Sequence, residues 1–204
     1  MSCRKPVGIF GGTFDPFHLG HLAALRNFAS KFDFEKILVV PTGIPPHKMR
    51  HSRVSAEDRV AMVRLGISSL PLAEVWDYEI RHAGKSYSYL TLQQAARLYP
   101  GCGLVFFTGS DMFLTLHAWK RPEIILSLAE IAVFSRTGDD FSALSAQKEF
   151  LETTYGAKCL LFSEKPVAVS STSVREELKK NGTSEYLPAA VGNYIREKGL
   201  YLSD

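Results

Sequence analysis

The fold of this chain is decided by the stretch Gly11-Gly12-Thr13-Phe14-Asp15-Pro16-Phe17-His18-Leu19-Gly20-His21. Before it comes the apolar run 6–10, typical of a buried strand, and after it the amphipathic segment 19–32, typical of a helix. A glycine-rich turn between a strand and a helix places backbone N–H groups and the positive end of the helix dipole beside a phosphate. His18 and His21 share one face of the first helical turn and can donate hydrogen bonds to the same phosphate group. The pattern predicts nucleotide transfer with no metal held by the protein itself, although two such histidines alone would also fit a surface pair or half of a metal site.

Composition excludes several other classes of protein. The 204 residues are 46% hydrophobic and 22% charged, which is ordinary for one soluble globular domain. The net charge of +3 is too small to argue for a nucleic-acid partner, and no apolar stretch reaches the roughly 18 residues of a membrane span. The apolar run after Arg4 and Lys5 is too short for a signal peptide. We therefore expect a cytoplasmic protein, a single domain over residues 1–204, and no nucleic-acid or membrane partner; a homo-oligomer is left open.

The cysteines show no pattern of paired or metal-binding residues. Cys3, Cys102 and Cys159 are far apart, odd in number and without CxxC spacing. The sequence therefore predicts isolated thiols, which fits a reducing compartment.

Strand and helix patterns alternate from one end of the chain to the other. Ser55 is the expected N-cap of the second helix and Ser171 that of the fourth, while Pro188 is the expected first residue of the last helix. Residues 137–145 are predicted as a loop that could hide a short helix. The predicted strands cover residues 6–10, 36–40, 73–78, 104–107, 131–134 and 158–162, and the predicted helices cover residues 19–32, 55–69, 88–99, 172–181 and 188–198.

This alternation predicts an α/β fold with a Rossmann-like, doubly wound, mostly parallel sheet flanked by helices, and with helices at the C-terminus. Ligands of such sheets bind at the carboxyl ends of the strands, near a switch in strand order. Because the motifs described below follow predicted strands, we expect them to meet at one edge of the sheet.

The tetrapeptide His18-Leu19-Gly20-His21 matches the HxGH motif of the nucleotidyltransferase α/β-phosphodiesterase superfamily, and the whole opening stretch resembles that superfamily's signature. Gly20 fits this role because a side chain there would crowd a nucleotide lying across the helix start. The residues that the resemblance assigns to ATP binding in this stretch are Gly11, Gly12, Thr13 and Phe14.

Nearly the full length of the chain is similar to the bacterial nicotinate mononucleotide adenylyltransferases. The run Pro45-Pro46-His47-Lys48 matches that family's loop after the second strand, which implies that Lys48 approaches the ATP phosphates. The basic cluster in 47–53 would also fit a solvated loop. Ser86-Tyr87-Ser88 stands where the family usually has Ser-Tyr-Thr, which implies that Ser86, Tyr87 and Ser88 bind the nicotinate ring and its carboxylate. Serine keeps the threonine hydroxyl and loses a methyl, and a helix N-cap is the alternative role for Ser88.

Three further positions carry the same resemblance. Gly109-Ser110-Asp111 resembles the family's Gly-x-Asp, which implies that Gly109 borders the ATP site and that Asp111 accepts hydrogen bonds from ribose hydroxyls. A helix N-cap is the alternative for Asp111. Trp119 matches the tryptophan that stacks on the nicotinate ring, with a plain core position as the alternative and Trp76 as the expected core tryptophan. Arg136 aligns with a basic position near the substrate.

A second phosphate cradle is predicted near the C-terminus. The run Val169-Ser170-Ser171-Thr172-Ser173-Val174-Arg175 resembles the family's Ile-Ser-Ser-Thr-x-x-Arg, with valine in place of isoleucine. Hydroxyl and N–H groups of Ser171 and Thr172 at a helix start would bind phosphate, and Arg175 would add a cation one turn further on.

The resemblance implies transfer of AMP from ATP to nicotinate mononucleotide, giving nicotinate adenine dinucleotide and pyrophosphate. The acceptor phosphate would attack in line, with His18 and His21 on the triphosphate, Lys48 and Arg175 on the leaving group, and Mg²⁺ arriving with ATP. One alternative is a sister enzyme such as the pantetheine-phosphate adenylyltransferase, and another is a non-catalytic nucleotide sensor. Nicotinate versus nicotinamide is left open, although backbone N–H donors at 86–88 favour a carboxylate.

Overall fold

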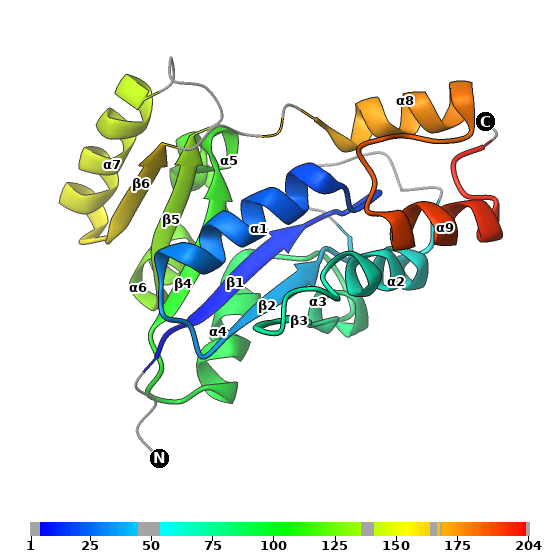
Figure 1. Ribbon diagram of the computed structural model, residues 1–204. Coiled ribbons are helices and arrows are strands. Elements are labelled where there is room, and N and C mark those ends of the chain that lie inside the picture. The colour runs from blue at the N-terminus through cyan, green and yellow to red at the C-terminus, as the bar shows by residue number, and fades with distance from the viewer. Residues whose placement is uncertain (1–4, 45–53, 136–140, 164–166, 168, 203–204) are drawn as a thin grey trace.

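Six parallel strands form one sheet in the order β3-β2-β1-β4-β5-β6 (Figure 1). This computed structural model describes residues 5–44, 54–135, 141–163, 167 and 169–202. The strands are β1 (Val7–Gly12), β2 (Lys36–Pro41), β3 (Ala73–Val75), β4 (Leu104–Gly109), β5 (Ala129–Ser135) and β6 (Cys159–Ser163). The predicted doubly wound sheet is confirmed, and all of its described strand pairs are parallel.

The strand order reverses in the middle of the sheet. Val7 of β1 lies opposite Lys36 of β2 on one side and opposite Leu104 of β4 on the other. The chain builds outward from β1 to β3, crosses back to β4, and then builds outward to β6. Because β1 and β4 flank the reversal, the loops that follow them occupy the place where sheets of this kind bind ligands.

Helices cover both faces of the sheet (Figure 1). Ile37 and Val39 of β2 face one helical layer, and Leu38 and Val40 face the other, so the strand is buried on both sides. No helix in the described ranges is long and apolar enough to cross a membrane. The first layer contains α1 (Leu19–Lys31), α2 (Ala56–Gly66), α8 (Ser171–Asn181) and α9 (Ala189–Lys198). The second contains α4 (Ser88–Leu98), α5 (Ser110–Leu114), α6 (Pro122–Leu128) and α7 (Phe141–Tyr155), and the short helices α3 (Tyr78–Arg81) and η1 (Leu116–Ala118) lie in connections.

Two predicted segments differ from the structure, and for the first of them the sequence leaves a short helix open as an alternative. Part of the expected loop 137–145 belongs to α7, which the sequence pattern hid because only Leu144 and Leu151 of this 15-residue helix are buried. The expected strand 73–78 ends at Val75, and Tyr78 begins the helix α3 instead.

Two predicted helix starts are displaced by one residue. The N-cap of α8 is Ser170, which forms a capping box with Ser173, whereas Ser171 is the first helical residue. Pro188 is the N-cap of α9 and not its first residue. Ser55 caps α2 as expected, accepting a hydrogen bond from the N–H of Asp58 at 3.0 Å.

The cysteines differ from expectation at one position. Cys102 takes part in a disulfide, so the prediction of isolated thiols is wrong for this residue. Cys159 is a free, buried thiol, and burial raises its pKa to about 12.

Candidate active site

The carbonyl oxygens of the loop between β1 and α1 accept hydrogen bonds that hold the loop in place. Among the described residues, the N–H groups of Thr13, Phe14 and Asp15 donate to no protein acceptor. A row of such N–H groups beside a helix N-terminus can bind an anion. The anchoring bonds run from Thr42 N to the Gly12 oxygen (2.9 Å), from Arg59 Nη1 to Thr13 (2.8 Å), from Arg175 Nη1 to Asp15 (2.6 Å) and from Ser171 Oγ to Pro16 (3.2 Å).

Two phenylalanines anchor the same loop in the core. Phe14 and Phe17 are 1% and 0% exposed. A Cβ added to Gly12 would lie 2.6 Å from the Phe14 ring, and one added to Gly66 of α2 would collide with the Phe17 ring. Phe14 also adopts a φ of 51°, which is uncommon for a residue with a side chain. Any contact between Phe14 and ATP is therefore restricted to its backbone.

His18 and His21 cap α1 together. His18 Nδ1 accepts from the N–H of His21 and His21 Nδ1 accepts from the N–H of His18, each at 3.3 Å, and the rings stack with centroids 3.7 Å apart. The rings of Phe14 and Phe17 lie 5.0 and 5.5 Å from that of His21. An Nδ1 that accepts a hydrogen bond places the proton of a neutral imidazole on Nε2. Each ring is therefore in the tautomer that can donate from Nε2 to a phosphate oxygen.

Half of a metal site was the alternative interpretation of the histidine pair. Within the part of the chain that the structure describes, no group of three or more His, Cys, Asp or Glu residues is placed to hold a metal ion.

Gly20 lies where the segment before α8 packs against the first turn of α1. A Cβ on Gly20 would lie 2.7 Å from Val169 Cγ1 and 3.0 Å from two atoms of the His18 ring. The sequence pattern suggested crowding of a nucleotide as the reason for glycine here. The structure adds a second reason, because Gly20 lets the segment before α8 pack directly on α1.

The start of α8 lies against the β1–α1 loop. Ser171 Oγ donates to the carbonyl oxygen of Pro16, and the Arg175 guanidinium bridges the Asp15 carbonyl and Thr172 Oγ1, at 2.6 and 3.1 Å. The predicted second cradle and the predicted first cradle are thus joined by hydrogen bonds across about 155 residues of chain.

The carboxyl end of β4 supplies the next predicted residues. Gly109 ends β4 and is the N-cap of α5, and Asp111 is the second residue of that helix, with an exposed side chain. The alternative of an N-cap role for Asp111 is therefore wrong. Its position next to the strand-order reversal is compatible with contact to a ribose.

Neither tryptophan is fully buried. Trp119 packs edge-on against Phe106 at 6.4 Å between ring centroids, and its Nε1 donates to Thr115 Oγ1 at 3.4 Å. Trp76, the expected core tryptophan, is also half-buried and stacks on Tyr78 at 5.1 Å. Burial therefore does not distinguish the two.

Ser86 is engaged within the protein. Its N–H donates to the Ile44 carbonyl at 2.9 Å, and its Oγ accepts from the N–H of Gly43 at 3.0 Å. Its hydroxyl also interacts with the carboxyl group of Glu79, which accepts from Thr91 Oγ1 at 2.7 Å. Burial raises the pKa of Glu79, and these two hydroxyls act in the opposite direction.

Tyr87 and Ser88 are placed at the start of α4. Tyr87 is the N-cap and makes no side-chain capping bond, and Ser88 is the first helical residue. The N-cap alternative for Ser88 is therefore wrong. Because Ser86 is engaged elsewhere, a substrate contact in this segment would fall to Tyr87 and Ser88.

The two remaining predicted site residues, Lys48 and Arg136, lie outside the described residues. Three others that organise the site were missed by the sequence pattern, namely Asp15, Arg59 and Tyr201. Asp15 lies within the signature stretch and could have been found there. Arg59 looks like an ordinary polar position of α2, and nothing in the sequence marks Tyr201.

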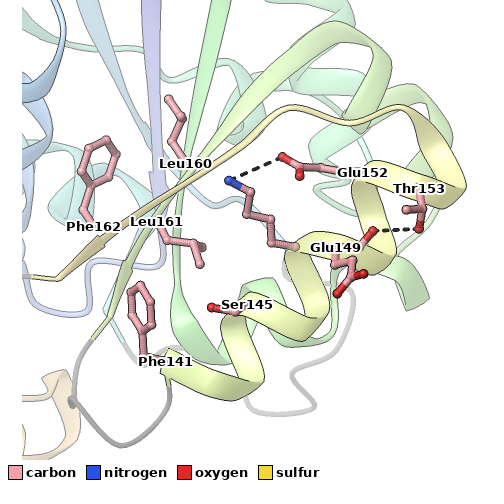
Figure 2. A pocket seen from close by; sticks show the side chains of 9 residues that line it. Phe141, Ser145, Glu149, Glu152, Thr153, Leu160, Leu161 and Phe162 are labelled. Atoms are coloured by element: carbon pink, nitrogen blue, oxygen red, sulfur yellow. Dashed lines mark hydrogen bonds and ion pairs between the residues drawn. The ribbon is translucent and has the colours of Figure 1, made fainter.

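A pocket of about 570 Å³ lies elsewhere, between α7 and β6 (Figure 2). It contains an ion pair between Lys148 Nζ and Glu152 Oε1 at 3.7 Å. The elements α7 and β6 lie at the opposite side of the molecule from α9 (Figure 1). No predicted site residue within the described ranges lines the pocket, so it is separate from the part of the predicted nucleotide site that the structure describes. Its lining residues are Phe141, Ser145, Lys148, Glu149, Glu152, Thr153, Leu160, Leu161 and Phe162.

A strand-order reversal, a loop that presents N–H groups, an HxGH histidine pair and an apposed serine-rich helix start define a nucleotide-binding α/β enzyme of the nucleotidyltransferase class. Comparison with known proteins agrees. The cytidylyltransferase-like family model matches residues 9–177.

Relatives of similar length make the assignment specific. The chain is 35% identical over 199 residues to a "Probable nicotinate-nucleotide adenylyltransferase" of Clostridium tetani, covering 97% of this chain and 99% of the relative. It is 39% identical over 203 residues to a protein of the same name from Desulfitobacterium hafniense, covering 97% and 96%. The chain belongs to the nicotinate-nucleotide adenylyltransferase family.

The fold is also shared with a solved structure of low sequence identity. Plasmodium falciparum nicotinic acid mononucleotide adenylyltransferase, solved as a complex with NaAD, has a TM-score of 0.78 to this chain at 21% identity. The match covers 98% of this chain and 99% of that one.

Proposed function

We propose that this protein transfers AMP from MgATP to nicotinate mononucleotide, releasing pyrophosphate and forming nicotinate adenine dinucleotide. The observation that carries the proposal is the bond from Arg175 to the Asp15 carbonyl, because it joins two anion cradles into one surface. A triphosphate needs several donors distributed along its length, and a single helix start would not supply them.

The chemistry requires positioning and charge neutralisation more than proton transfer. The second pKa of a phosphate monoester is about 6, so the acceptor phosphate is already a nucleophile near neutral pH. The N–H groups of Thr13, Phe14 and Asp15 and the imidazoles of His18 and His21 would bind the triphosphate. Bonds that tighten as charge moves to the leaving pyrophosphate would lower the barrier. Arg175 and, by resemblance, Lys48 are proposed for that role.

Mg²⁺ is proposed as part of the substrate MgATP. A triphosphate binds this ion through its own oxygens, and Mg²⁺ retains several water ligands in such complexes.

Further residues of both cradles are proposed to hold the adenylyl donor. Gly11 and Gly12 would let the nucleotide approach the backbone, Gly109 would border it, and Asp111 would accept hydrogen bonds from its ribose hydroxyls. Ser171 and Thr172 would contact its phosphates at the start of α8.

The acceptor is proposed to bind beside α4. Tyr87 and Ser88 would direct N–H groups of the first helical turn to the nicotinate carboxylate, and Trp119 would stack on its ring. Arg136 would add a positive charge nearby. A carboxylate accepts hydrogen bonds only, whereas an amide also donates, so a site built from donors favours nicotinate over nicotinamide. Ser86 would act indirectly, by fixing this segment to Gly43 and Glu79.

Residues 1–204 are proposed to form one domain of a cytoplasmic enzyme. The packing of Val174 and Leu178 of α8 and Val191 and Ile195 of α9 into the same core cluster as α1 supports a single unit.

The test is pyrophosphate release with MgATP and a panel of acceptors: nicotinate mononucleotide, nicotinamide mononucleotide and phosphopantetheine. We expect nicotinate mononucleotide to give the highest kcat/KM by at least about tenfold, the size of one discriminating polar contact. Turnover with phosphopantetheine alone would identify a sister enzyme. ATP binding with no turnover on any acceptor would identify a nucleotide sensor.

A further inference from the structure

Tyr201, at the C-terminal end of the described chain, contacts the signature loop directly. Its hydroxyl donates a hydrogen bond to Asp15 Oδ1 at 2.6 Å, across 186 residues of sequence. The backbone carbonyl of the same Asp15 accepts from Arg175. Asp15 is therefore held twice, by its side chain and by its backbone, from two different C-terminal segments.

A buried cation lies close to both Asp15 and Tyr201. Arg59 of α2 is 4% exposed, donates from Nη1 to the Thr13 carbonyl, and is attracted by the Asp15 carboxylate. Its Nε is buried and has no hydrogen-bond partner among the described residues. The carboxylate of Asp15 thus accepts a hydrogen bond from a tyrosine hydroxyl that orients it and balances the charge of a nearby guanidinium.

The backbone is constrained at both ends of this contact. Phe14, immediately before Asp15, has a φ of 51°, and Tyr201 has a φ of 65°. Residues with side chains adopt this left-handed region only where their surroundings hold them in it. The hydrogen bond between Tyr201 and Asp15 therefore joins two segments whose conformations each require support.

We propose that Tyr201 is a positioning residue for the adenylyl-transfer reaction. Through Asp15 it holds the loop 13–18 in the conformation that presents its N–H groups and the two imidazoles to the ATP phosphates. This proposal rests on the proposed function. Tyr201 does not contact the reacting atoms in this account, and its effect on catalysis is transmitted by the Asp15 side chain.

The chain contains a matched control for the test. Tyr194 Oη donates to Asp58 Oδ1 at 2.7 Å, so it too joins the C-terminal region to a carboxylate near the start of α2. Asp58 is not part of the signature loop. Tyr194→Phe and Tyr201→Phe each delete one hydroxyl and one tyrosine–carboxylate bond, but only the second change removes a bond to the loop.

The experiment measures steady-state kinetics with MgATP and nicotinate mononucleotide, together with thermal unfolding, for both variants. We expect Tyr201→Phe to raise the KM for ATP about tenfold while the KM for nicotinate mononucleotide changes less than about twofold, because loss of one hydrogen bond to a charged group displaces the ATP loop. Tyr194→Phe should leave both KM values as in the wild type. A purely structural role would lower the melting temperature of both variants without moving either KM.

A double-variant cycle tests whether the effect of Tyr201 on ATP binding is transmitted by Asp15. If Tyr201 acts through Asp15, Tyr201→Phe should have no further effect on the KM for ATP in an Asp15→Ala background. Additive effects in that cycle, or an unchanged KM for ATP in folded Tyr201→Phe, would overturn the proposal. Absence of turnover in the wild-type protein would instead count against the proposed function.

Discussion

Arg175 Nη1 lies 2.6 Å from the carbonyl oxygen of Asp15, with 160 residues of chain between the two. This bond places a helix start from the C-terminal part of the chain against the loop that follows the first strand. Ser171 Oγ strengthens the same junction by donating to the Pro16 carbonyl. Two segments that each resemble an ordinary anion site in sequence thereby form one extended surface.

Arg175 should not tolerate lysine. Lysine keeps the charge, but its single ammonium group cannot reproduce the planar bridge from the Asp15 carbonyl to Thr172 Oγ1. We expect Arg175→Lys to lower kcat/KM by about tenfold to a hundredfold, since part of the transition-state stabilisation is lost. Lys180→Ala, at an exposed position of the same helix, is the control and should keep normal kinetics. Equal activity of the two variants would exclude the bridge as a catalytic requirement.

The histidine pair allows the structural role to be separated from the catalytic one. Asparagine is among the best N-cap residues, so His18→Asn keeps an acceptor for the N–H of His21 while removing the imidazole Nε2 donor. We expect the variant to fold, and kcat to fall about a hundredfold, equivalent to about 3 kcal/mol. His21→Ala should show a similar loss of kcat. Near-normal turnover in folded His18→Asn would mean that His18 serves only as a helix cap.

Gly20→Ala should destabilise the protein although alanine is the better helix former. The added Cβ meets Val169 Cγ1 at 2.7 Å, an overlap that we expect to cost about 1–3 kcal/mol of unfolding free energy. Gly192→Ala in α9 is the matched control, because its Cβ meets only Leu187 at 3.9 Å, and it should stabilise by about 0.5–1 kcal/mol.

A second substitution identifies the cause of the Gly20→Ala effect. Combining it with Val169→Ala removes the overlapping Cγ1, so the double variant should recover stability relative to the sum of the single variants in urea unfolding. Strict additivity would show that Val169 does not pack on Gly20 in solution.

Glu79 should make stability depend on pH in a characteristic direction. Burial raises its pKa in the folded state above the ordinary value of 4.5. At a pH between 4.5 and the raised folded-state pKa, Glu79 is protonated more fully in the folded protein than in the unfolded one. The contribution of Glu79 to the free energy of unfolding therefore falls as pH rises through that interval. Glu79→Gln should remove this slope, which can reach at most about 1.4 kcal/mol per pH unit.

Asp58 provides the comparison of opposite sign. Hydrogen bonds from Tyr194 and Ser55 lower its pKa below 3.8, so its contribution is present above that value and is lost as pH falls through the folded-state pKa. Urea unfolding across acidic to neutral pH should therefore give difference curves of opposite slope for Glu79→Gln and Asp58→Asn. If the free energy of unfolding depended on pH in the same way in the wild type and in Glu79→Gln, a raised pKa of Glu79 would be contradicted.

The sequence predicted the architecture because continuous apolar runs such as 36–40 are typical of strands buried on both faces. It also indicated which stretches are candidates for phosphate binding, because the His18–His21 and Ser170–Arg175 patterns are local, and the structure brings these two stretches into contact. It missed α7, whose buried residues Leu144 and Leu151 are too few to give a helical period.

What the sequence pattern did not indicate is how the site is held together. The bond from Tyr201 to Asp15 and the burial of Arg59 beneath the same loop are long-range contacts of residues that look ordinary in their own segments. The sequence pattern also did not indicate that the Phe14 side chain is buried in the core, which leaves only its backbone for the predicted contact with ATP.

We propose that the loop 13–18 and the start of α8 together form one ATP site. The most direct test is amide hydrogen exchange of the intact protein during titration with a non-hydrolysable ATP analogue and Mg²⁺. We expect exchange to slow in both segments with the same midpoint concentration of the analogue. Protection of only one segment, or two different midpoints, would contradict it.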